Sequence, residues 1–430
     1  MTEVFTRMTK DDLPECLQFL SKAFKRDDPE AFKALFPRIM RPSDEAMNAH
    51  HCIKLDGKIV GMAASYPLVL KYGDLSLKVA GSGNIAVDET CRGKGYMSAL
   101  LNHTAKEDEK DGFAFSYFHG NEARYRRFGY HKCGVQCSFD INDRFFDPKL
   151  DISGITFEDL TKQSDEILKK AYELYKTQYH FEREFEDYKL ALPSNGSTNY
   201  AVFKHGEFIG YIVHAEYIKN IYLSDLNDFA VVMKAYLNHK NTATVCYVVP
   251  DTEYELMRTA IEYSESYRMW PPANFRIYDF KKTVEFFLKI KLTNGDFEGS
   301  FTIDSDIFGK WSITAKNGVP CVEKTDGKAD FTLKGLEVYD FLFAGNNAFR
   351  QSLTAGANAI LPIPIYCPYL NCHKINPVVV NMTSTGLLFE FLRNDEASFP
   401  TLNYLVGNGA LTVPFLSLII NNDTYFSLQR

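Results

Sequence analysis

The sequence lacks the features that mark several common ligand classes. No cluster of lysines and arginines stands out and the formal net charge is −7, which argues against a nucleic-acid partner. The nine cysteines are an odd number and are scattered along the chain. The closest sets, Cys133 with Cys137 and Cys367 with Cys372, do not have the spacing of a zinc site, so we expect no metal. Scattered thiols without a disulfide framework are typical of a reducing compartment, which predicts a cytoplasmic location.

Long apolar runs are also missing. The N-terminal stretch MTEVFTRMTKDDLPE has no signal-peptide core, and the apolar runs near Ala359–Leu370 and Leu411–Ile420 are short and contain prolines. We therefore expect no membrane span. The chain has 430 residues, 45% of them hydrophobic and 24% charged. This composition is that of a soluble globular protein with two or three domains.

The most informative stretch is Ile85–Tyr96, IAVDETCRGKGY. Its first residues are typical of a strand end, and the apolar spacing from Met97 to Leu101 predicts a helix after the glycines. A strand that turns at glycines into a helix start gathers free backbone N–H groups, and the helix dipole favours an anion there. Glycines also lack the Cβ atoms that would hold a phosphate away from the backbone. With the added charges of Arg92 and Lys94, this turn suits a pyrophosphate.

Two well-known phosphate-binding turns do not have the glycine spacing of this stretch. A Walker loop has more widely spaced glycines and ends in Lys-Ser or Lys-Thr, and a Rossmann fingerprint is G-x-G-x-x-G. Neither pattern is present here. Two interpretations stay open on these residues alone, a surface turn with solvated charges and a coenzyme A site.

A second stretch, Asn121–Tyr130 (NEARYRRFGY), follows a predicted strand at Phe113–Phe118. Asn121 is a plausible helix cap, and Glu122–Arg127 is predicted to be a short helix. Gly129 can supply the left-handed residue with which many helices end. The sequence therefore predicts a second strand-to-helix turn downstream of the first.

These two stretches resemble the two motifs of the GNAT acetyltransferases. Arg92–Met97 resembles motif A, R-x-x-G-x-G/A, and N-x-A-x-Y-x-x-x-G-Y within Asn121–Tyr130 resembles motif B. Met97 stands where most of the superfamily has a small residue, but a larger apolar residue is usual in the Eis (enhanced intracellular survival) branch. The string Tyr125–Tyr130 is similar to the Eis-type Y-x-R-F-G-Y. The resemblance covers roughly residues 1–350.

The resemblance implies a mixed α/β (α+β) chain with tandem GNAT-like domains. The expected divisions are an acetyl-CoA domain at 1–150, a second GNAT-like domain without the cofactor motif at 151–288, and a sterol carrier protein-like domain at 289–430. The first part shows hairpin signals at Asp56-Gly57 and Gly73-Asp74. The second part repeats the style of the first, with a hairpin at His205-Gly206 and a helix at Phe229–His239, but it has no glycine-rich turn after a strand. The string Leu292–Val322 alternates predicted strands and turns and precedes a helix at Gly335–Phe343.

The resemblance also implies the site residues, with Tyr125 at the general-acid position and acetyl-CoA as co-substrate. The implied cofactor-binding residues are Ile85, Ala86, Val87, Arg92, Gly93, Lys94, Gly95, Tyr96, Met97, Ser98, Asn121 and Glu122. In Eis enzymes the general base is the carboxylate of a C-terminal aromatic residue. This chain ends at Arg430 instead, in a region that departs from the family after about Ala355. The Arg430 carboxylate, Glu122 and a water molecule are therefore all candidates for the base.

The predicted function is acetyl transfer from acetyl-CoA to a primary amine of the aminoglycoside, lysine or polyamine type, in a homo-oligomer that the resemblance makes a hexamer or trimer. Acidic Asp27 and Asp28 after the first predicted helix either face a polycationic amine or are solvated loop charges. The alternative function is a non-catalytic lipid-binding or scaffold protein with a relic acetyltransferase fold. Intact Gly93 and Gly95 favour the enzyme, because a relic would tolerate bulkier residues there.

Overall fold

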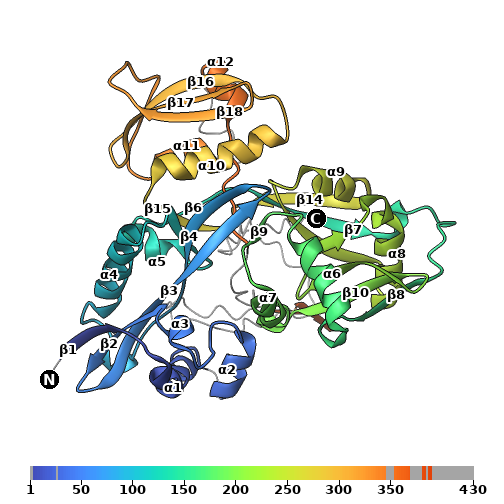
Figure 1. Cartoon of the computed structure of the whole chain (residues 1–430), viewed down its shortest axis with the longest axis horizontal. Coiled ribbons are helices and arrows are strands. Elements are labelled where there is room, and N and C mark those ends of the chain that lie inside the picture. The colour runs from blue at the N-terminus through green and yellow to red at the C-terminus, as the bar shows by residue number, and fades with distance from the viewer. Residues whose placement is uncertain (1–2, 26–27, 345–352, 369–379, 384–385, 390–430) are drawn as a thin grey trace. The chain divides into compact units, whose positions relative to one another are not determined.

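The chain divides into two compact units, residues 1–372 and 373–430. The computed structural model describes residues 3–25, 28–344, 353–368, 380–383 and 386–389. In the second unit it describes one antiparallel hairpin, β20 (Val380–Thr383) with β21 (Gly386–Phe389). All other elements named below belong to the first unit (Figure 1).

The first sheet has the strand order β1-β2-β3-β4-β5-β15-β6, with β9 paired to β3. Its strands are β1 (Glu3–Arg7), β2 (His50–Leu55), β3 (Lys58–Tyr72), β4 (Leu75–Val87), β5 (Phe115–Phe118), β6 (His131–Cys133), β9 (His180–Phe181) and β15 (Ala273–Ile277). Strands β1 to β4 form an antiparallel meander, whereas β4 and β5 are parallel and pair only at Ala80 with Ser116 and Gly81 with Tyr117. Beyond Gly81 these two strands separate.

Local sequence explains the meander. Asp56 and Gly57 both have positive φ, 48° and 84°, as the tight turn of a two-residue hairpin requires. The predicted hairpin around Gly73 is also confirmed, with β3 and β4 in register from Tyr72 paired to Leu75. The helices before the meander are α1 (Leu13–Ala23), α2 (Pro29–Leu35) and α3 (Asp44–Met47), and α4 (Tyr96–Lys110) connects β4 to β5.

The second sheet has the strand order β14-β7-β13-β12-β11-β10-β8. Its strands are β7 (Gln136–Asn142), β8 (Ile155–Asp159), β10 (Thr198–Lys204), β11 (Glu207–His214), β12 (Ile218–Leu223), β13 (Thr244–Pro250) and β14 (Ser264–Trp270). Its helices are α6 (Asp165–Tyr175), α7 (Phe185–Ala191), α8 (Phe229–Lys240) and α9 (Tyr254–Glu262). Strands β12 and β13 are parallel and pair at Ile218 with Tyr247, with α8 between them in sequence. This sheet therefore repeats the design of the first.

The two large sheets exchange strands across the sequence. Strand β7 lies before the expected division at residue 150 yet pairs with β13 and β14 of the second sheet. Strand β15 comes from residues 273–277 yet lies inside the first sheet, between β5 and β6. Neither sheet is therefore made from one continuous piece of the chain.

The third sheet has the order β18-β17-β16-β19. It contains β16 (Gly299–Ser305), β17 (Gly309–Lys316), β18 (Val319–Lys324) and β19 (Phe331–Leu333), and its helices are α10 (Phe280–Thr293), α11 (Glu337–Phe343) and α12 (Ala355–Ile360). The predicted helix at Gly335–Phe343 corresponds to α11. The sequence interpretation did not anticipate α10, which includes Leu292, the residue expected to begin the strand-and-turn region.

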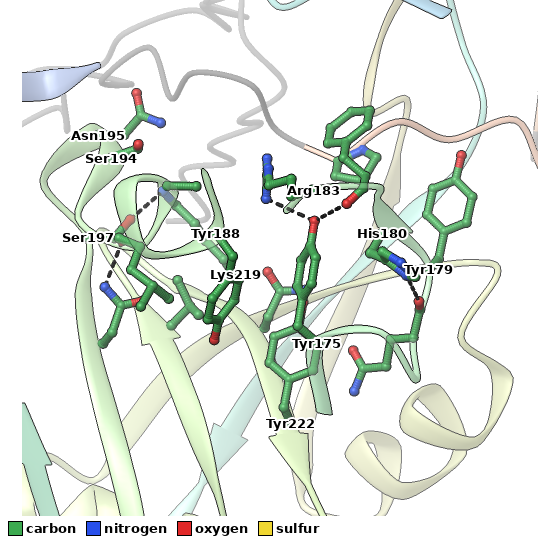
Figure 2. Close-up of a pocket in the computed structure, with 18 of the residues that line it drawn as sticks. Tyr175, Tyr179, His180, Arg183, Tyr188, Ser194, Asn195, Ser197, Lys219 and Tyr222 are labelled. Atoms are coloured by element: carbon green, nitrogen blue, oxygen red, sulfur yellow. Dashed lines mark hydrogen bonds between the residues drawn. The ribbon is translucent and has the colours of Figure 1, made fainter. Parts of the chain in front are cut away.

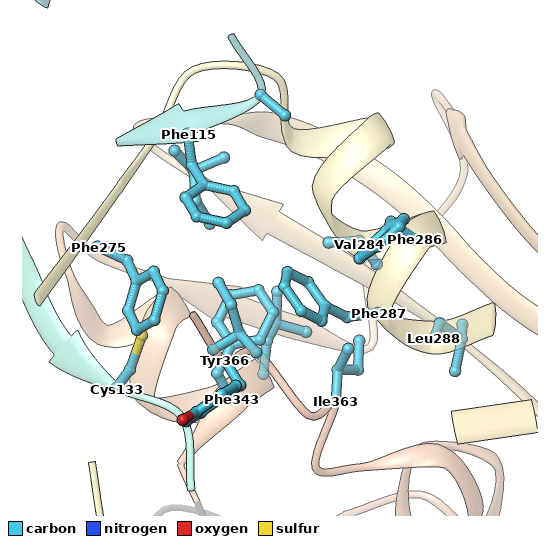
Figure 3. Packing of buried hydrophobic residues seen from close by; sticks show 14 of the residues in the cluster. Phe115, Cys133, Phe275, Val284, Phe286, Phe287, Leu288, Phe343, Ile363 and Tyr366 are labelled. Atoms are coloured by element: carbon cyan, nitrogen blue, oxygen red, sulfur yellow. The ribbon is translucent and has the colours of Figure 1, made fainter. Parts of the chain in front are cut away.

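One apolar cluster joins the first sheet to the third. Phe115 of β5 and Phe275 of β15 have ring centroids 5.6 Å apart, and Phe115 lies 6.0 Å from Phe287 of α10. Val284, Phe343 and other side chains of this cluster are almost wholly buried (Figure 3). The packing fixes β5, which borders the candidate site described next.

Candidate active site

The glycine-rich turn lies between the end of β4 and the start of α4. Gly93 and Gly95 have φ of 78° and 84°, and Gly95 is the N-cap of α4. Such a conformation strains any residue with a Cβ atom. A Cβ atom added at either glycine would meet no atom within 4 Å, so packing inside the protein does not explain why these two residues are glycines. Open space beside them fits a ligand that approaches the backbone.

The start of α4 adds hydrogen-bond donors to this space. The first helical bond of the N-terminus runs from Ala99 N–H to Gly95 C=O, so the N–H groups of Tyr96, Met97 and Ser98 precede the intrahelical ladder. Arg92 and Lys94 are exposed beside them. Free donors, a helix dipole and two cationic side chains together form a cradle that fits a diphosphate.

Strand β4 offers an open edge next to this cradle. Beyond Gly81, β4 pairs with β3, as in Met62 with Ala86 and Gly61 with Val87, while among the described strands nothing pairs with its other edge. Asn84 has φ of 50° and lies near the shift in register between β3 and β4. The predicted contacts Ile85, Ala86 and Val87 are all partly exposed here. Their backbone groups are placed to pair with an extended amide chain.

Helix α5 (Glu122–Tyr125) follows β5 and is capped by Asn121, whose Oδ1 accepts from Ala123 N–H at 3.0 Å. Tyr125 is 8% exposed, and its ring packs 4.3 Å from that of Phe118 in a tilted edge arrangement. Ile85 and Met97 pack against the same cluster. The structure thus brings Tyr125 together with residues of the glycine-turn motif, which are far away in sequence.

The side chain of Glu122 contacts other residues of the protein. Its Oε1 lies 2.7 Å from Nδ1 of His131 and 3.7 Å from Nη1 of Arg126. Asn121 is likewise occupied by capping α5. If these two residues contact a cofactor, the contact therefore uses their backbone or a remaining polar atom.

A buried polar network beneath β4 and β5 was missed by the sequence interpretation. The Asp108 carboxylate of α4 accepts from Ser65 and from the Tyr278 hydroxyl. The Ser116 hydroxyl then joins Tyr278 to Tyr130, at 2.8 Å from each. Burial raises the pKa of Asp108 to about 6. One signal was available, because Asp108 continues the apolar positions Leu101 and Ala105 at helical spacing.

Tyr130 packs against Phe118 with ring centroids 4.8 Å apart. Its hydroxyl also contacts Ser82 at 3.1 Å, on the first residue of β4 beyond the pairing with β5. The network therefore ends where the two strands separate.

A cavity of about 150 Å³ lies between the segment after α2 and the elements α6, β9, α7 and β12 (Figure 2). Tyrosines form much of its wall, among them Tyr175, Tyr179 and Tyr222, and Arg183 and Lys219 also line it. Phe181, another lining residue, stacks on Tyr117 of β5 at 6.3 Å. Tyr117 is the last residue of β5 that pairs with β4. The cavity therefore borders the separation of these strands.

Two site predictions cannot be placed. Arg430, the candidate for the general base, and Asp27 lie outside the described residues. Asp28 is described, and its carboxylate caps α2 by accepting from Glu30 N–H at 2.9 Å. Within the described part of the chain, no group of three or more His, Cys, Asp or Glu side chains is arranged to hold a metal. No helix in that part has both the length and the apolar character required to cross a bilayer.

A comparison with known families identifies the N-terminal part of the chain. The model of the "Acetyltransferase (GNAT) domain" family matches residues 5–133. Residues 5–133 form a GNAT acetyltransferase domain. The match includes both motifs, β4, β5 and the cradle, and it identifies the protein as an acetyltransferase that uses acetyl-CoA as co-substrate.

Solved structures extend the likeness of this acetyltransferase over most of the chain. A probable N-acyltransferase from Enterococcus faecalis V583 matches with a TM-score of 0.59 and 15% identity, over 83% of this chain and 95% of its own. A GCN5-related N-acetyltransferase from Anabaena variabilis matches with 0.60 and 16%, over 86% and 98%. Eis1 from Mycobacterium abscessus matches with 0.57 and 14%, over 84% and 96%. At these identities the likeness is one of fold, a mixed α/β architecture. A search of curated proteins finds no match.

Proposed function

We propose that this acetyltransferase moves the acetyl group of acetyl-CoA to the nitrogen of a primary amine, by direct attack in a ternary complex. The observation that carries the proposal is the open space beside Gly93 and Gly95 in the cradle. In a relic domain without a ligand, bulkier residues could occupy this space. In the proposed complex, residues 92–98 hold the diphosphate and Ile85, Ala86 and Val87 pair with the pantetheine arm. Asn121 and Glu122 complete the site near the acetyl end.

The chemistry assigns one role to Tyr125. The amine must first lose a proton, because an ammonium has no lone pair with which to attack the thioester carbonyl. When the tetrahedral intermediate collapses, the C–S bond breaks and the thiolate that leaves takes a proton. A phenol, with an ordinary pKa of about 10, can give that proton. The clustering of Tyr125 with Ile85 and Met97 supports this role.

The base that deprotonates the amine is proposed to be the carboxylate of Arg430 or a water molecule. Glu122 is a weaker candidate than these two, because its carboxylate already contacts His131. Acceptors of the aminoglycoside, lysine and polyamine classes are all compatible with a deprotonated primary amine as nucleophile.

The remaining parts of the proposal concern organisation. We propose domains at 1–150, 151–288 and 289–430, with exchanged strands between the first two. The four-stranded sheet with α10 and α11 supports an α+β third domain, for which a sterol carrier protein-like fold with a structural role is proposed. A homo-oligomer, hexameric or trimeric, and a cytoplasmic location complete the proposal.

Thermal unfolding with and without acetyl-CoA tests the proposal most cheaply. Ligand at 100 times its dissociation constant should add about 2.7 kcal/mol of stability. Release of free CoA over a panel of amines then reports turnover. No change in the melting temperature would favour the alternative, a lipid-binding or scaffold protein without catalysis.

A further inference from the structure

The cavity of Figure 2 carries an excess of positive charge. Arg38, from the segment after α2, and Arg183, from the segment after β9, both line it, and both are partly buried. No hydrogen bond or ion pair joins the Arg38 guanidinium to another described residue. Burial, and next the nearby Arg183 guanidinium, lower the pKa of Arg38. The Asp187 carboxylate opposes this shift, but the pKa of Arg38 stays lowered, so two cations line one cavity.

Arg183 is held in place, and no carboxylate of the described residues forms an ion pair with it. Its Nη1 donates to the Tyr175 hydroxyl at 2.9 Å, and its guanidinium lies 5.6 Å from the ring centroids of Tyr175 and Phe181. Its Nε is buried and has no hydrogen-bond partner among the residues that the structure describes. Figure 2 shows the contact with Tyr175 on one side of the cavity and Lys219 with Ser197 on another. A stacked, oriented guanidinium with spare donors is what recognition of a carboxylate or phosphate requires.

The carboxylates near the cavity already have partners. Asp187 pairs with Arg41, with Oδ1 and Nη1 2.8 Å apart. Glu253 accepts from Tyr179 N–H at 2.8 Å, and burial raises the pKa of its carboxyl group, which favours the neutral form. His180 also lines the cavity, and burial lowers its pKa, so it adds little charge near neutral pH. Among the described residues no carboxylate forms an ion pair with Arg38 or Arg183, so both guanidinium groups can bind a ligand that enters the cavity.

One polar atom in the wall is also unsatisfied. Asn199 is 1% exposed and donates from Nδ2 to Leu192 C=O at 2.7 Å, but its Oδ1 has no partner in the described part of the chain. Leaving such a buried acceptor unpaired costs roughly 1–3 kcal/mol. A ligand with an O–H or N–H group would satisfy it. A cavity of similar volume in another protein holds a ring the size of benzene, so the ligand group is small.

We propose that this cavity is the acceptor subsite, and that the acceptor is a small primary amine bearing a carboxylate or phosphate that Arg38 and Arg183 bind. The inference rests on the proposed N-acetyl transfer, and it replaces the polycationic acceptors by anionic or zwitterionic ones. The stacking of Phe181 on Tyr117 supports it, because it puts the cavity beside the point where β4 and β5 separate. The anion would then anchor one end of the acceptor while its amine reaches the acetyl group.

Matched pairs of amines test this inference. Lysine and cadaverine differ by one carboxylate, and glucosamine 6-phosphate and glucosamine differ by one phosphate. For each pair we expect the anionic member to have a kcat/KM at least about 10-fold higher. Equal turnover of both members, a preference for the uncharged or cationic member, or turnover of neither pair overturns the assignment.

Variants of the two arginines test which residues cause the preference for anionic amines. Arg38→Gln and Arg183→Gln should remove it by raising KM for the anionic members much more than KM for cadaverine, while the affinity for acetyl-CoA stays unchanged. Arg183→Lys keeps the charge but not the planar guanidinium group, so it should retain part of the preference for anionic amines. It takes the place of Arg183→Gln if that variant does not fold. Arg258→Gln changes an exposed arginine of α9 and serves as the control. Equal loss of activity with every amine would overturn the assignment and indicate a structural role.

The same anion could come from the chain itself, through the carboxylate of Arg430. A pair preference that is absent in the native chain and appears only after residues are added beyond Arg430 would assign the subsite to the C-terminus and overturn the acceptor assignment. Failure of the proposed function is distinguishable, because it would abolish stabilisation by acetyl-CoA. Failure of this inference alone leaves that stabilisation intact.

Discussion

Nε2 of His131 in β6 donates to Oδ1 of Asp340 in α11 over 2.9 Å. Nδ1 of the same imidazole lies 2.7 Å from Oε1 of Glu122, the first residue of α5. The His131 side chain is only 7% exposed. A short chain of polar contacts therefore runs from the helix that carries Tyr125 to a helix near the third sheet.

The contact between His131 and Asp340 should be measurable as a coupling free energy between the two residues. Asp340→Asn is expected to lower the free energy of unfolding by about 1.5–3 kcal/mol, since hydrogen bonds to charged groups contribute about that much. In a His131→Asn background, Asp340→Asn should lower the free energy of unfolding by clearly less. A double-mutant cycle measured by urea titration would show this difference. Asp304→Asn, which removes the more exposed pair with Lys310 at 3.6 Å, should cost under about 1 kcal/mol. Additive effects of the two changes would mean that the contact contributes nothing.

Substitution of Gly95 should separate ligand binding from backbone strain. Ala at φ of 84° is strained by roughly 1–2 kcal/mol, and its Cβ would enter the space assigned to the diphosphate. We expect the Kd for acetyl-CoA to rise at least about 10-fold, measured by calorimetry. Gly206→Ala is the matched control, because Gly206 also has φ of 84° and open space but lies in the β10–β11 turn. An unchanged Kd in Gly95→Ala would remove the cradle from the site.

The phenol of Tyr125 is predicted to act in chemistry and not in binding. Tyr125→Phe keeps the ring that packs on Phe118 and removes the proton donor. Turnover should fall by roughly 10²–10⁴-fold, while the Kd for acetyl-CoA stays within a factor of about two. Tyr267→Phe, at an exposed position of β14, controls for the loss of a hydroxyl elsewhere. Near-normal turnover of Tyr125→Phe would exclude it as the general acid.

The buried carboxyl group of Asp108 predicts a pH dependence of stability. Asp in an unfolded chain titrates near 3.9, whereas burial raises the pKa of Asp108 to about 6 in the folded protein. Between these values the folded state binds more protons than the unfolded state, so stability falls as pH rises from about 4 to about 6. The fall should amount to about 3 kcal/mol from this group. Asp108→Asn should flatten that part of the profile in chemical denaturation at several pH values, and an unchanged slope would contradict the assignment.

The local sequence was enough to predict the turns, because the conformation of a turn depends on the few residues within it. Gly93, Gly95 and Gly129 sit in left-handed conformations, and the turn dipeptides fixed the hairpins around Gly57 and Gly73. Features made by distant residues were not predictable in this way. The network of Ser65, Asp108 and Tyr278 is one example, because each side chain reads as an ordinary polar residue until the sheet brings them together.

The same limit applies to the cavity. Arg38 and Arg183 come from segments separated by more than a hundred residues, and nothing in either segment distinguishes a solvated arginine from one that lines a cavity. The placement of β15 within the first sheet was equally hidden, since its sequence shows only that a strand is present. Pairing partners depend on the whole fold.

Residues 273–277 complete the sheet that carries the cradle. During synthesis on the ribosome, residues 1–150 must therefore wait until the strand at residues 273–277 has emerged before β5 and β6 gain the strand between them. A nascent chain released or cleaved near residue 150 would expose those two unpaired edges. Such a fragment is expected to need chaperones, and expression of residues 1–150 alone is expected to yield aggregate.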